Sequence, residues 1–313
     1  MSLLKKLFHH NSTKYSKHNH WYYLAPALIL MVLFNFYPLV KTLFISLDSR
    51  YNKFADTFSY SFNFSNYTTT FCDPDFRTAL FNTFLLVFVA VPISIFLSLM
   101  IALALNSVYN RFLKNIFQTI FFLPYLTNPV IMGMVFAVLF YHNSFGIQTR
   151  PEGFFNSFFG LQQDWINISA PYSYKMFVLI FYVVWKSLPF QILIFSVGLK
   201  NISKDYYDAA GIDGASKITI FRKITLPLLA PTIFYQLIIA IIQVFKEYES
   251  VVGVFGNSDI TKVNTVVGYI YQQLEGTLMD SYSRGAAATV ILLLISIIFT
   301  TINFFFFEKK LNE

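Results

Sequence analysis

Residues 202–231 read ISKDYYDAAGIDGASKITIFRKITLPLLAP, a polar stretch between two long apolar runs. Ser203 is placed to cap a short helix, because its side chain can accept hydrogen bonds from the first free backbone N–H groups. The glycines at 211 and 214 then predict a turn. A second helix follows, and we expect Asp213 to cap it. The stretch therefore predicts a compact helix-turn-helix between two apolar segments.

Small side chains surround this turn: Ala209, Ala210, Gly214 and Ala215. Short side chains allow a second protein to approach the backbone closely, so we expect this segment to dock onto another protein. At Gly214 we expect either a tight contact with that partner or a left-handed backbone, which glycine adopts without steric cost.

On both sides of residues 202–231 the chain is strongly apolar. Of its 313 residues, 56% are hydrophobic and 12% are charged, against roughly a quarter charged in soluble domains. This composition excludes an ordinary soluble domain and a disordered chain. The single cysteine, Cys72, excludes an intramolecular disulfide and a thiolate metal cluster. A membrane protein is therefore predicted.

Six apolar runs are long enough to cross a bilayer as helices, which takes about 20 residues. Their length favours helices over the shorter strands of a membrane barrel. Several contain prolines, which kink a membrane helix and are tolerated where protein or water satisfies the freed backbone groups. We predict an all-α protein with six transmembrane helices, at 21–47, 80–105, 116–141, 176–199, 224–245 and 285–307.

These runs also predict how the chain is divided. A secretory signal is the alternative for the first run, since lysines precede it, but the run is too long and lacks a small-residue cleavage site. We expect a basic tail at 1–20, a first membrane helix at 21–47, an external segment at 48–79, a five-helix core at 80–307 that includes the 202–231 segment, and a tail at 308–313.

The distribution of lysine and arginine predicts the orientation. The two tails and the segments 106–115 and 200–223 together hold 13 of these residues, whereas the longer alternate segments hold 8. Positive charge accumulates on the cytoplasmic side of membrane proteins, so both termini and the 202–231 segment are expected in the cytoplasm. The same scatter of charge in short segments argues against nucleic-acid binding, which needs a basic face on a folded polar domain.

A fixed spacing within 202–231 resembles a known family. Asp208-Ala209-Ala210 is followed four residues later by Gly214 and, after nine more residues, by Ile224 and Leu226-Pro227. The pattern resembles the cytoplasmic EAA loop of permease subunits in bacterial binding-protein-dependent ABC importers, with Asp208 in place of the family's usual glutamate. The resemblance implies a role in ATPase coupling for Asp208, Ala209, Ala210, Asp213, Gly214, Ala215, Ile224, Leu226 and Pro227.

Other stretches are similar to the carbohydrate-uptake permeases of that family: YPLVKTLFISL at 37–47, FFLPYLTNPV at 121–130 and VWKSLPFQILIFSVGLKNIS at 184–203. The external loop at 253–264 departs from the family, because Phe-Gly-Asn-Ser at 255–258 stands where a Thr-Gly-Gly-Pro turn is common. The resemblance implies a multi-pass protein of the bacterial inner membrane. It also implies three kinds of partner: a second homologous permease, a pair of cytoplasmic ATPases and an external solute-binding protein.

The chain carries no phosphate-binding loop of the form G-x-x-x-x-G-K-[ST]. We therefore expect ATP and Mg²⁺ to be used by the partner ATPase, and this chain to bind no cofactor and to be no enzyme. His9, His10, His18 and His20 lie in the N-terminal tail. A solvated tail near anionic lipid is favoured there over a metal site.

Polar groups at membrane depth are the candidates for a transport pathway, because a charge at the bilayer centre costs about 2.5 to 3.5 kcal/mol on insertion scales. The alternative is that Lys186 pairs structurally with Glu247 or Glu249, or that the charged residues after Gln243 lie at the outer interface. The candidates occur on the two runs that flank the 202–231 segment: Lys186, Ser187, Phe190, Gln191, Gln236, Gln243, Glu247, Tyr248 and Glu249.

The residue types favour a neutral saccharide as substrate. Phe190 and Tyr248 can stack on sugar faces, while Gln191, Gln243 and Glu249 can hydrogen-bond to hydroxyl groups. Glycerol phosphate or a related polyol phosphate is the alternative, although acidic side chains repel an anion. A self-contained secondary transporter would show an internal repeat and a coupling-ion site, and a membrane enzyme would need convergent His, Asp or Glu at depth. The sequence indicates neither.

Overall fold

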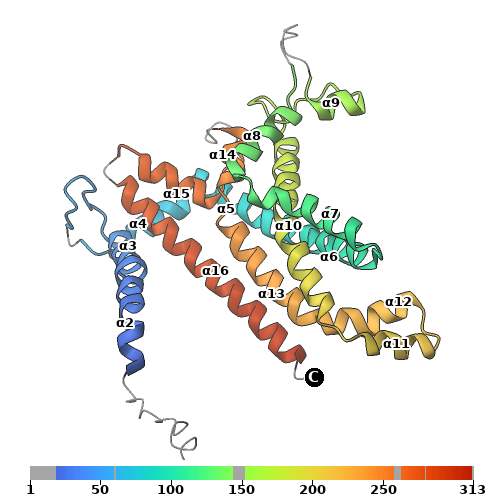
Figure 1. Ribbon diagram of the computed structural model, residues 1–313. Coiled ribbons are helices and arrows are strands. Elements are labelled where there is room, and N and C mark those ends of the chain that lie inside the picture. The colour runs from blue at the N-terminus through green and yellow to red at the C-terminus, as the bar shows by residue number, and fades with distance from the viewer. Residues whose placement is uncertain (1–18, 60, 144–151, 257–261, 279, 312–313) are drawn as a thin grey trace, which may run out of the picture.

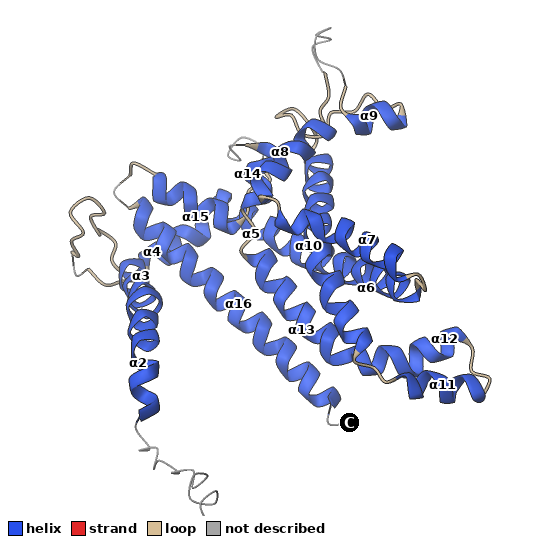
Figure 2. Ribbon diagram, in the orientation of Figure 1, coloured by secondary structure: helices blue, strands red, loops and turns tan. Residues whose placement is uncertain are grey.

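Apolar runs with no alternation of polarity fold as helices, and the computed structural model consists of helices joined by short loops (Figure 1). It describes residues 19–59, 61–143, 152–256, 262–278 and 280–311. The expectations for the tail at 1–18, for 257–261 in the external loop and for the last two residues lie outside this range. Figure 2 shows the helical architecture, and the described residues pair as strands only at two isolated bridges, Asp48 with Phe62 and Asn52 with Thr57.

The predicted membrane helices are present. Five helices meet the length and hydropathy of a bilayer span: Tyr22–Leu47, Pro74–Ser107, Tyr172–Lys200, Lys217–Phe245 and Ser281–Phe305. A sixth span is reached if the bent pair Phe112–Leu126 and Pro129–Leu139 counts as one. The second helix begins at Pro74, inside the predicted external segment, because Asp73 caps it by accepting from the Asp75 N–H.

Three spans contain a π-helical turn directly before a proline. Proline lacks an N–H and its ring clashes with the carbonyl four residues earlier, so a wider turn relieves the clash. The prolines are Pro38, Pro92 and Pro227. The spans are α2 (Asn19–Met31), η1 (Val32–Phe36) and α3 (Tyr37–Leu47); α5 (Pro74–Leu85), η2 (Leu86–Ala90) and α6 (Val91–Ser107); and α12 (Lys217–Ile220), η4 (Phe221–Thr225) and α13 (Leu226–Phe245).

The third span is broken. It consists of α7 (Arg111–Phe122), the 3₁₀ turn η3 (Leu123–Leu126) and α8 (Pro129–Leu139). The two halves meet at 102°. Asn128 begins α8 by accepting from the N–H of Val130 at 2.9 Å, and Pro129 follows at the first helical position. The prolines predicted a kink in a single span, whereas a polar cap followed by proline makes this run two helices.

The remaining elements are two long helices and a set of short ones. The long helices are α10 (Tyr172–Lys200) and α16 (Ser281–Leu311). The short ones are α4 (Ser65–Cys72), α9 (Phe154–Phe159), α11 (Lys204–Ile212), α14 (Glu249–Phe255) and α15 (Val266–Glu275). In Figure 1, α11 and α12 lie at the same end of the bundle as the C-terminus, and α8, α9 and α14 lie at the opposite end.

The core forms around α6, α10 and α13, whose buried side chains include Leu99, Phe195 and Leu229. A tight crossing joins α8 to α14. A Cβ added at Gly133 would lie 2.6 Å from the Cα of Gly253, so both helices need glycine there. This crossing holds α14 beside α10, and both helices line a polar cavity. The first span is different, because only 6% of its most apolar stretch is buried.

Candidate functional site

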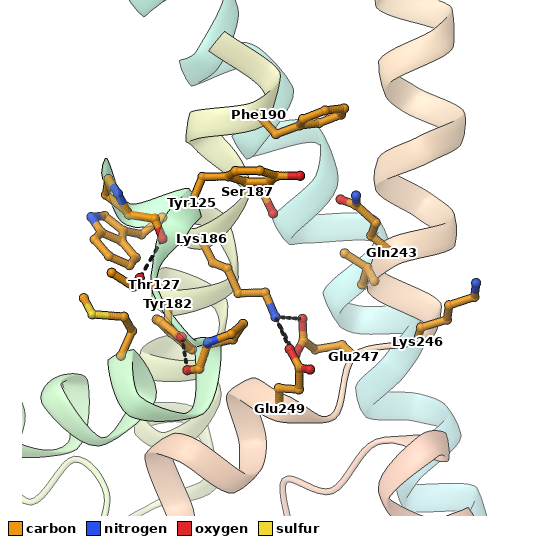
Figure 3. Close-up of a pocket in the computed structure, with 15 residues that line it drawn as sticks. Tyr125, Thr127, Tyr182, Lys186, Ser187, Phe190, Gln243, Lys246, Glu247 and Glu249 are labelled. Atoms are coloured by element: carbon orange, nitrogen blue, oxygen red, sulfur yellow. Dashed lines mark hydrogen bonds and ion pairs between the residues drawn. The ribbon is translucent and has the colours of Figure 1, made fainter. Parts of the chain in front are cut away.

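A cavity of about 360 Å³ lies between α10 and α13, closed on one side by η3 and α8 and on another by α14. We call it the outer cavity, because α8 and α14, which help to line it, lie at the end of the bundle opposite α11 and α12 (Figure 1). Figure 3 shows its lining residues. Its lining mixes aromatic rings, hydroxyls, an amide and four charged groups. The lining residues are Pro124, Tyr125, Thr127, Pro129, Met132, Tyr182, Trp185, Lys186, Ser187, Phe190, Gln243, Val244, Lys246, Glu247 and Glu249.

Helix α10 supplies three of the predicted pathway residues. Lys186, Ser187 and Phe190 are neighbours on one face, since residues one turn apart lie above each other on a helix. The Ser187 hydroxyl donates to the Val183 carbonyl at 2.8 Å. Pro189 lies between them inside the helix. The prediction that polar groups near Pro189 share one space is consistent with this geometry.

An ion pair closes one end of the outer cavity. The Lys186 ammonium lies 2.8 Å from one Glu247 carboxylate oxygen and 3.0 Å from the other, and it donates to the Ser250 hydroxyl at 3.2 Å. Glu249 is farther, at 3.9 Å. Glu247 is 5% exposed and also accepts the Ser250 backbone N–H at 3.0 Å. The Glu247 carboxylate is therefore neutralised and hydrogen-bonded, as a buried charge requires.

Two aromatic rings meet at the other end. Tyr125 of η3 stacks on Phe190 of α10, with ring centroids 5.9 Å apart and planes 19° apart. Phe122 also contacts Tyr125, with ring centroids 5.3 Å apart and planes tilted by 32°. Figure 3 shows Tyr125 and Phe190 together, away from the Lys186 and Glu247 pair. We call Phe122, Tyr125 and Phe190 the aromatic stack.

Three predicted pathway residues lie outside the cavity lining. Gln191 is buried, where its amide donates to the Ser94 hydroxyl and accepts from the Ser98 hydroxyl, both at 3.1 Å. Gln236 is fully buried and donates to the Gln191 carbonyl at 3.3 Å. The prediction that these glutamines line the pathway is not supported by their positions, since both fasten α6, α10 and α13 together.

Tyr248 is the third. Its ring stacks on Tyr271 of α15 with centroids 4.4 Å apart. The face of Tyr248 that was expected to meet a sugar is therefore turned to another aromatic ring.

The sequence reasoning missed several lining residues. Tyr125, Thr127, Met132, Tyr182 and Trp185 line the cavity, yet each reads as an ordinary residue of an apolar run. The break after Leu126 is what turns η3 toward α10. The sequence signal that could have identified these residues is the pair of prolines that flank them, Pro124 and Pro129.

The second candidate region is the α11–α12 hairpin. Ser203 caps α11 as predicted, accepting the Asp205 N–H at 3.3 Å. Asp208 and Ala209 are exposed, whereas Ala210 is buried. Ala215 N–H donates to the Ala210 carbonyl at 2.9 Å and closes the turn. Of the small residues, Ala209 and Gly214 are thus exposed to solvent, Ala215 is half-buried and Ala210 is buried in the hairpin.

The prediction that Asp213 caps the second helix was wrong. Asp213 ends α11, and Ser216 caps α12 by accepting the Thr219 N–H at 3.3 Å. Gly211, expected in the turn, lies within α11. Gly214 has a positive φ of +68°. Helix α12 begins three residues later, at Lys217. This φ confirms the left-handed backbone expected at Gly214.

The hairpin joins the cavity wall without a break. The helix from Lys217 runs through η4 into α13 and ends at Phe245. Ile224, Leu226 and Pro227 lie along this continuous stretch. Helix α12 and Gln243 therefore lie on one continuous helical stretch. Among the described residues no group of three or more His, Cys, Asp or Glu side chains gathers in a metal-binding arrangement.

Comparison with known proteins identifies relatives over most of the chain. Residues 90–311 match the family described as "Binding-protein-dependent transport system inner membrane component". The arabinooligosaccharides transport system permease protein AraP of Bacillus subtilis is 31% identical over 265 residues, which cover 84% of this chain and 80% of that protein. The sn-glycerol-3-phosphate transport system permease protein UgpA of Escherichia coli is 29% identical over 253 residues, covering 80% and 81%.

A solved structure shares the fold. A chain of a bacterial ABC transporter involved in the import of the acidic polysaccharide alginate matches with a TM-score of 0.76 over 99% of each chain. The two sequences are 19% identical, so this likeness concerns the fold alone.

Proposed function

The chain belongs to the family of binding-protein-dependent transport system inner membrane components, and on that premise we propose that it carries a neutral sugar or oligosaccharide through its outer cavity. It is a multi-pass permease subunit of an ABC importer in the cell membrane. Relatives at about 30% identity are named for arabinooligosaccharide and glycerol-phosphate transport. The lining of the outer cavity supports the sugar among these two substrate classes.

The observation that carries the proposal is the charge balance of the outer cavity. Its two cations and two anions are Lys186, Lys246, Glu247 and Glu249. Lys186 is held by Glu247 at 2.8 Å, so its charge is already compensated. A phosphate group at Lys186 would have to compete with that carboxylate and approach Glu249 as well, which leaves Lys246 as the cation of the lining that could attract it. A neutral polyhydroxy compound meets no such repulsion and finds aromatic faces, an amide and hydroxyls, the usual groups of a polar ligand site.

We also propose three partners. An external solute-binding protein would deliver the sugar, a second permease would complete the pathway, and a pair of ATPases would bind the α11–α12 hairpin and supply ATP hydrolysis with Mg²⁺. The exposed small residues of the hairpin and its continuity with α13 support the ATPase contact. Positive charge in the tails and around the hairpin supports a cytoplasmic location for both.

The test is substrate-stimulated ATP hydrolysis and uptake by the reconstituted complex with its binding protein. The panel consists of arabinotriose, lactose and maltotriose, with glycerol 3-phosphate as the anionic comparator. We expect at least one neutral sugar to stimulate hydrolysis and to enter the vesicles. Stimulation by glycerol 3-phosphate alone would replace the proposal with the polyol-phosphate alternative.

A further inference from the structure

A second cavity lies against the other side of the aromatic stack. It has a volume of about 340 Å³ and lies between α7 and the half of α10 nearer the α11–α12 hairpin. We call it the inner cavity. Its polar lining consists of Asn115, Gln118 and Thr119 from α7 and Ser196 from α10. None of the described side chains that line it is charged.

Neighbouring residues of η3 and α10 separate the two cavities. On η3, Tyr125 faces the outer cavity, whereas Leu123 and Leu126 face the inner one. On α10, Phe190 faces the outer cavity and its neighbour Pro189 the inner one. The aromatic stack crosses this wall, because Phe122 lines the inner cavity and contacts Tyr125. The two cavities are thus consecutive spaces along α10.

The faces of α7 indicate what fills the inner cavity. Asn115, Gln118 and Thr119 recur at helical spacing and line the cavity, while Ile116 and Ile120 are exposed and absent from that lining. Polar side chains inside a membrane span face the bundle interior or a water-filled space. The polar face of α7 therefore borders water and the apolar face borders lipid.

The polar groups of the inner cavity are available to a ligand. Within the described part of the chain, the side-chain amides of Asn115 and Gln118 take part in no protein hydrogen bond. Thr119 donates to the Asn115 carbonyl at 2.9 Å, which leaves its oxygen able to accept. Ser196 is 7% exposed, and its hydroxyl has no partner among the described groups; this oxygen is itself buried, so a ligand reaches it only where the neighbouring side chains move aside. Amides and hydroxyls without a nearby charge match the hydroxyl groups of a neutral polyol.

We propose that the inner cavity is a second saccharide subsite, separated from the outer one by the aromatic stack and lined by Asn115, Gln118, Thr119 and Ser196. A sugar leaving the outer cavity would pass the stack at Phe190 and be held by neutral hydrogen bonds before release. This inference rests on the proposed import of a neutral sugar. It adds a binding step on the hairpin side of the stack.

Cysteine labelling tests the inner cavity independently of transport. Gln118→Cys and Ile120→Cys are introduced separately in a Cys72→Ser chain, in the full complex, and inverted membrane vesicles are treated with a charged thiosulfonate reagent. The reagent needs a hydrated thiolate, so we expect Gln118→Cys to react about tenfold faster than the lipid-facing Ile120→Cys. Whichever of arabinotriose, lactose and maltotriose the complex imports should slow the labelling, and glycerol 3-phosphate should not.

The outcomes separate the two proposals. Slow labelling of Gln118→Cys together with normal sugar uptake would overturn the inner subsite and leave the proposed function standing. Fast labelling that the imported sugar does not slow would reduce the inner cavity to a water-filled space, which also overturns the subsite. If none of the three sugars is imported, the proposed function fails. A Gln118→Leu variant should lower uptake at subsaturating sugar by about threefold to tenfold, the effect of one lost neutral hydrogen bond.

Discussion

The outer and inner cavities are similar in size and differ in charge. The outer cavity, about 360 Å³, is lined by four charged side chains, and the inner cavity, about 340 Å³, is lined by none among the described residues. In the outer cavity the buried Glu247 is already bound to Lys186. The comparison shows that charged side chains beside a transport pathway need not bind the substrate. Here the Lys186–Glu247 pair fixes α10 to α14, and the groups left for a solute are neutral in the inner cavity, whereas the outer cavity also offers the exposed Lys246 and Glu249.

The largest effect is expected from a change that touches neither cavity. Gly214 has φ of +68°, and a Cβ there would meet nothing within 4 Å. Valine at this position is therefore opposed by backbone strain of about 1 to 3 kcal/mol rather than by crowding within the chain. We predict that Gly214→Val abolishes uptake through loss of ATPase association or of substrate-stimulated hydrolysis, while the protein still inserts into the membrane.

Gly211→Ala is the matched control for Gly214→Val. Gly211 lies inside α11 with open space around it and without a positive φ, so alanine favours the helix by up to about 1 kcal/mol. We expect this variant to transport normally. Purification of a Gly214→Val complex with stoichiometric ATPase and full binding-protein-stimulated hydrolysis would remove the coupling role from the hairpin.

The second prediction tests whether the outer-cavity charges are structural. Lys186→Met leaves the 5%-exposed Glu247 without its cation, and loss of one partner of a buried pair costs about 3 to 5 kcal/mol. We expect a clear fall in the melting temperature of the detergent-solubilised complex. Lys186→Met combined with Glu247→Gln should recover most of that loss, because no buried charge then remains.

Lys246→Met serves as the control for the ion pair. Lys246 lines the same cavity but is exposed, and exposed substitutions usually change stability by less than about 0.5 kcal/mol. An equal loss of stability in Lys186→Met and Lys246→Met would mean that the pair does not brace α10 against α14. The contrast drawn between the two cavities would then fail.

The features predictable from the sequence were those set by local pattern. Apolar run length predicted the spans, and a serine before an acidic turn predicted the Ser203 cap. The prolines predicted a kink in the third span, although not its complete break at η3. The Lys186 pair was foreseen as an alternative, because a lysine in a membrane span needs an anion.

The direction in which each side chain faces was less predictable from the sequence. Consecutive helical residues point about 100° apart, so Phe190 enters the outer cavity while Gln191 turns into the core and binds Ser94 and Ser98. Which residue of such a pair meets the cavity depends on how α10 packs against α6 and α13. Gln118 escaped notice for the same reason, because its partner wall on α10 is distant in sequence.

The smallest effect separates two glutamines that the sequence placed together. Gln243 lines the outer cavity and is exposed to it, whereas Gln191 is buried in the hydrogen-bonded contact between α6 and α10. Gln243→Leu should lower uptake at subsaturating sugar by about twofold to tenfold, the value of one neutral hydrogen bond, with an unchanged melting temperature. Gln191→Leu should instead lower the melting temperature, because the Ser94 and Ser98 hydroxyls lose the amide that joins α6 to α10 and keep only their bonds to the Val91 and Ile95 carbonyls of α6 itself. Uptake assays and thermal melting on the same preparations measure both quantities. Two results would contradict this assignment: a lower melting temperature in Gln243→Leu, or a lower uptake in Gln191→Leu with an unchanged melting temperature. Either result would mean that the boundary of the outer cavity is misplaced and that Gln191, not Gln243, contacts the sugar.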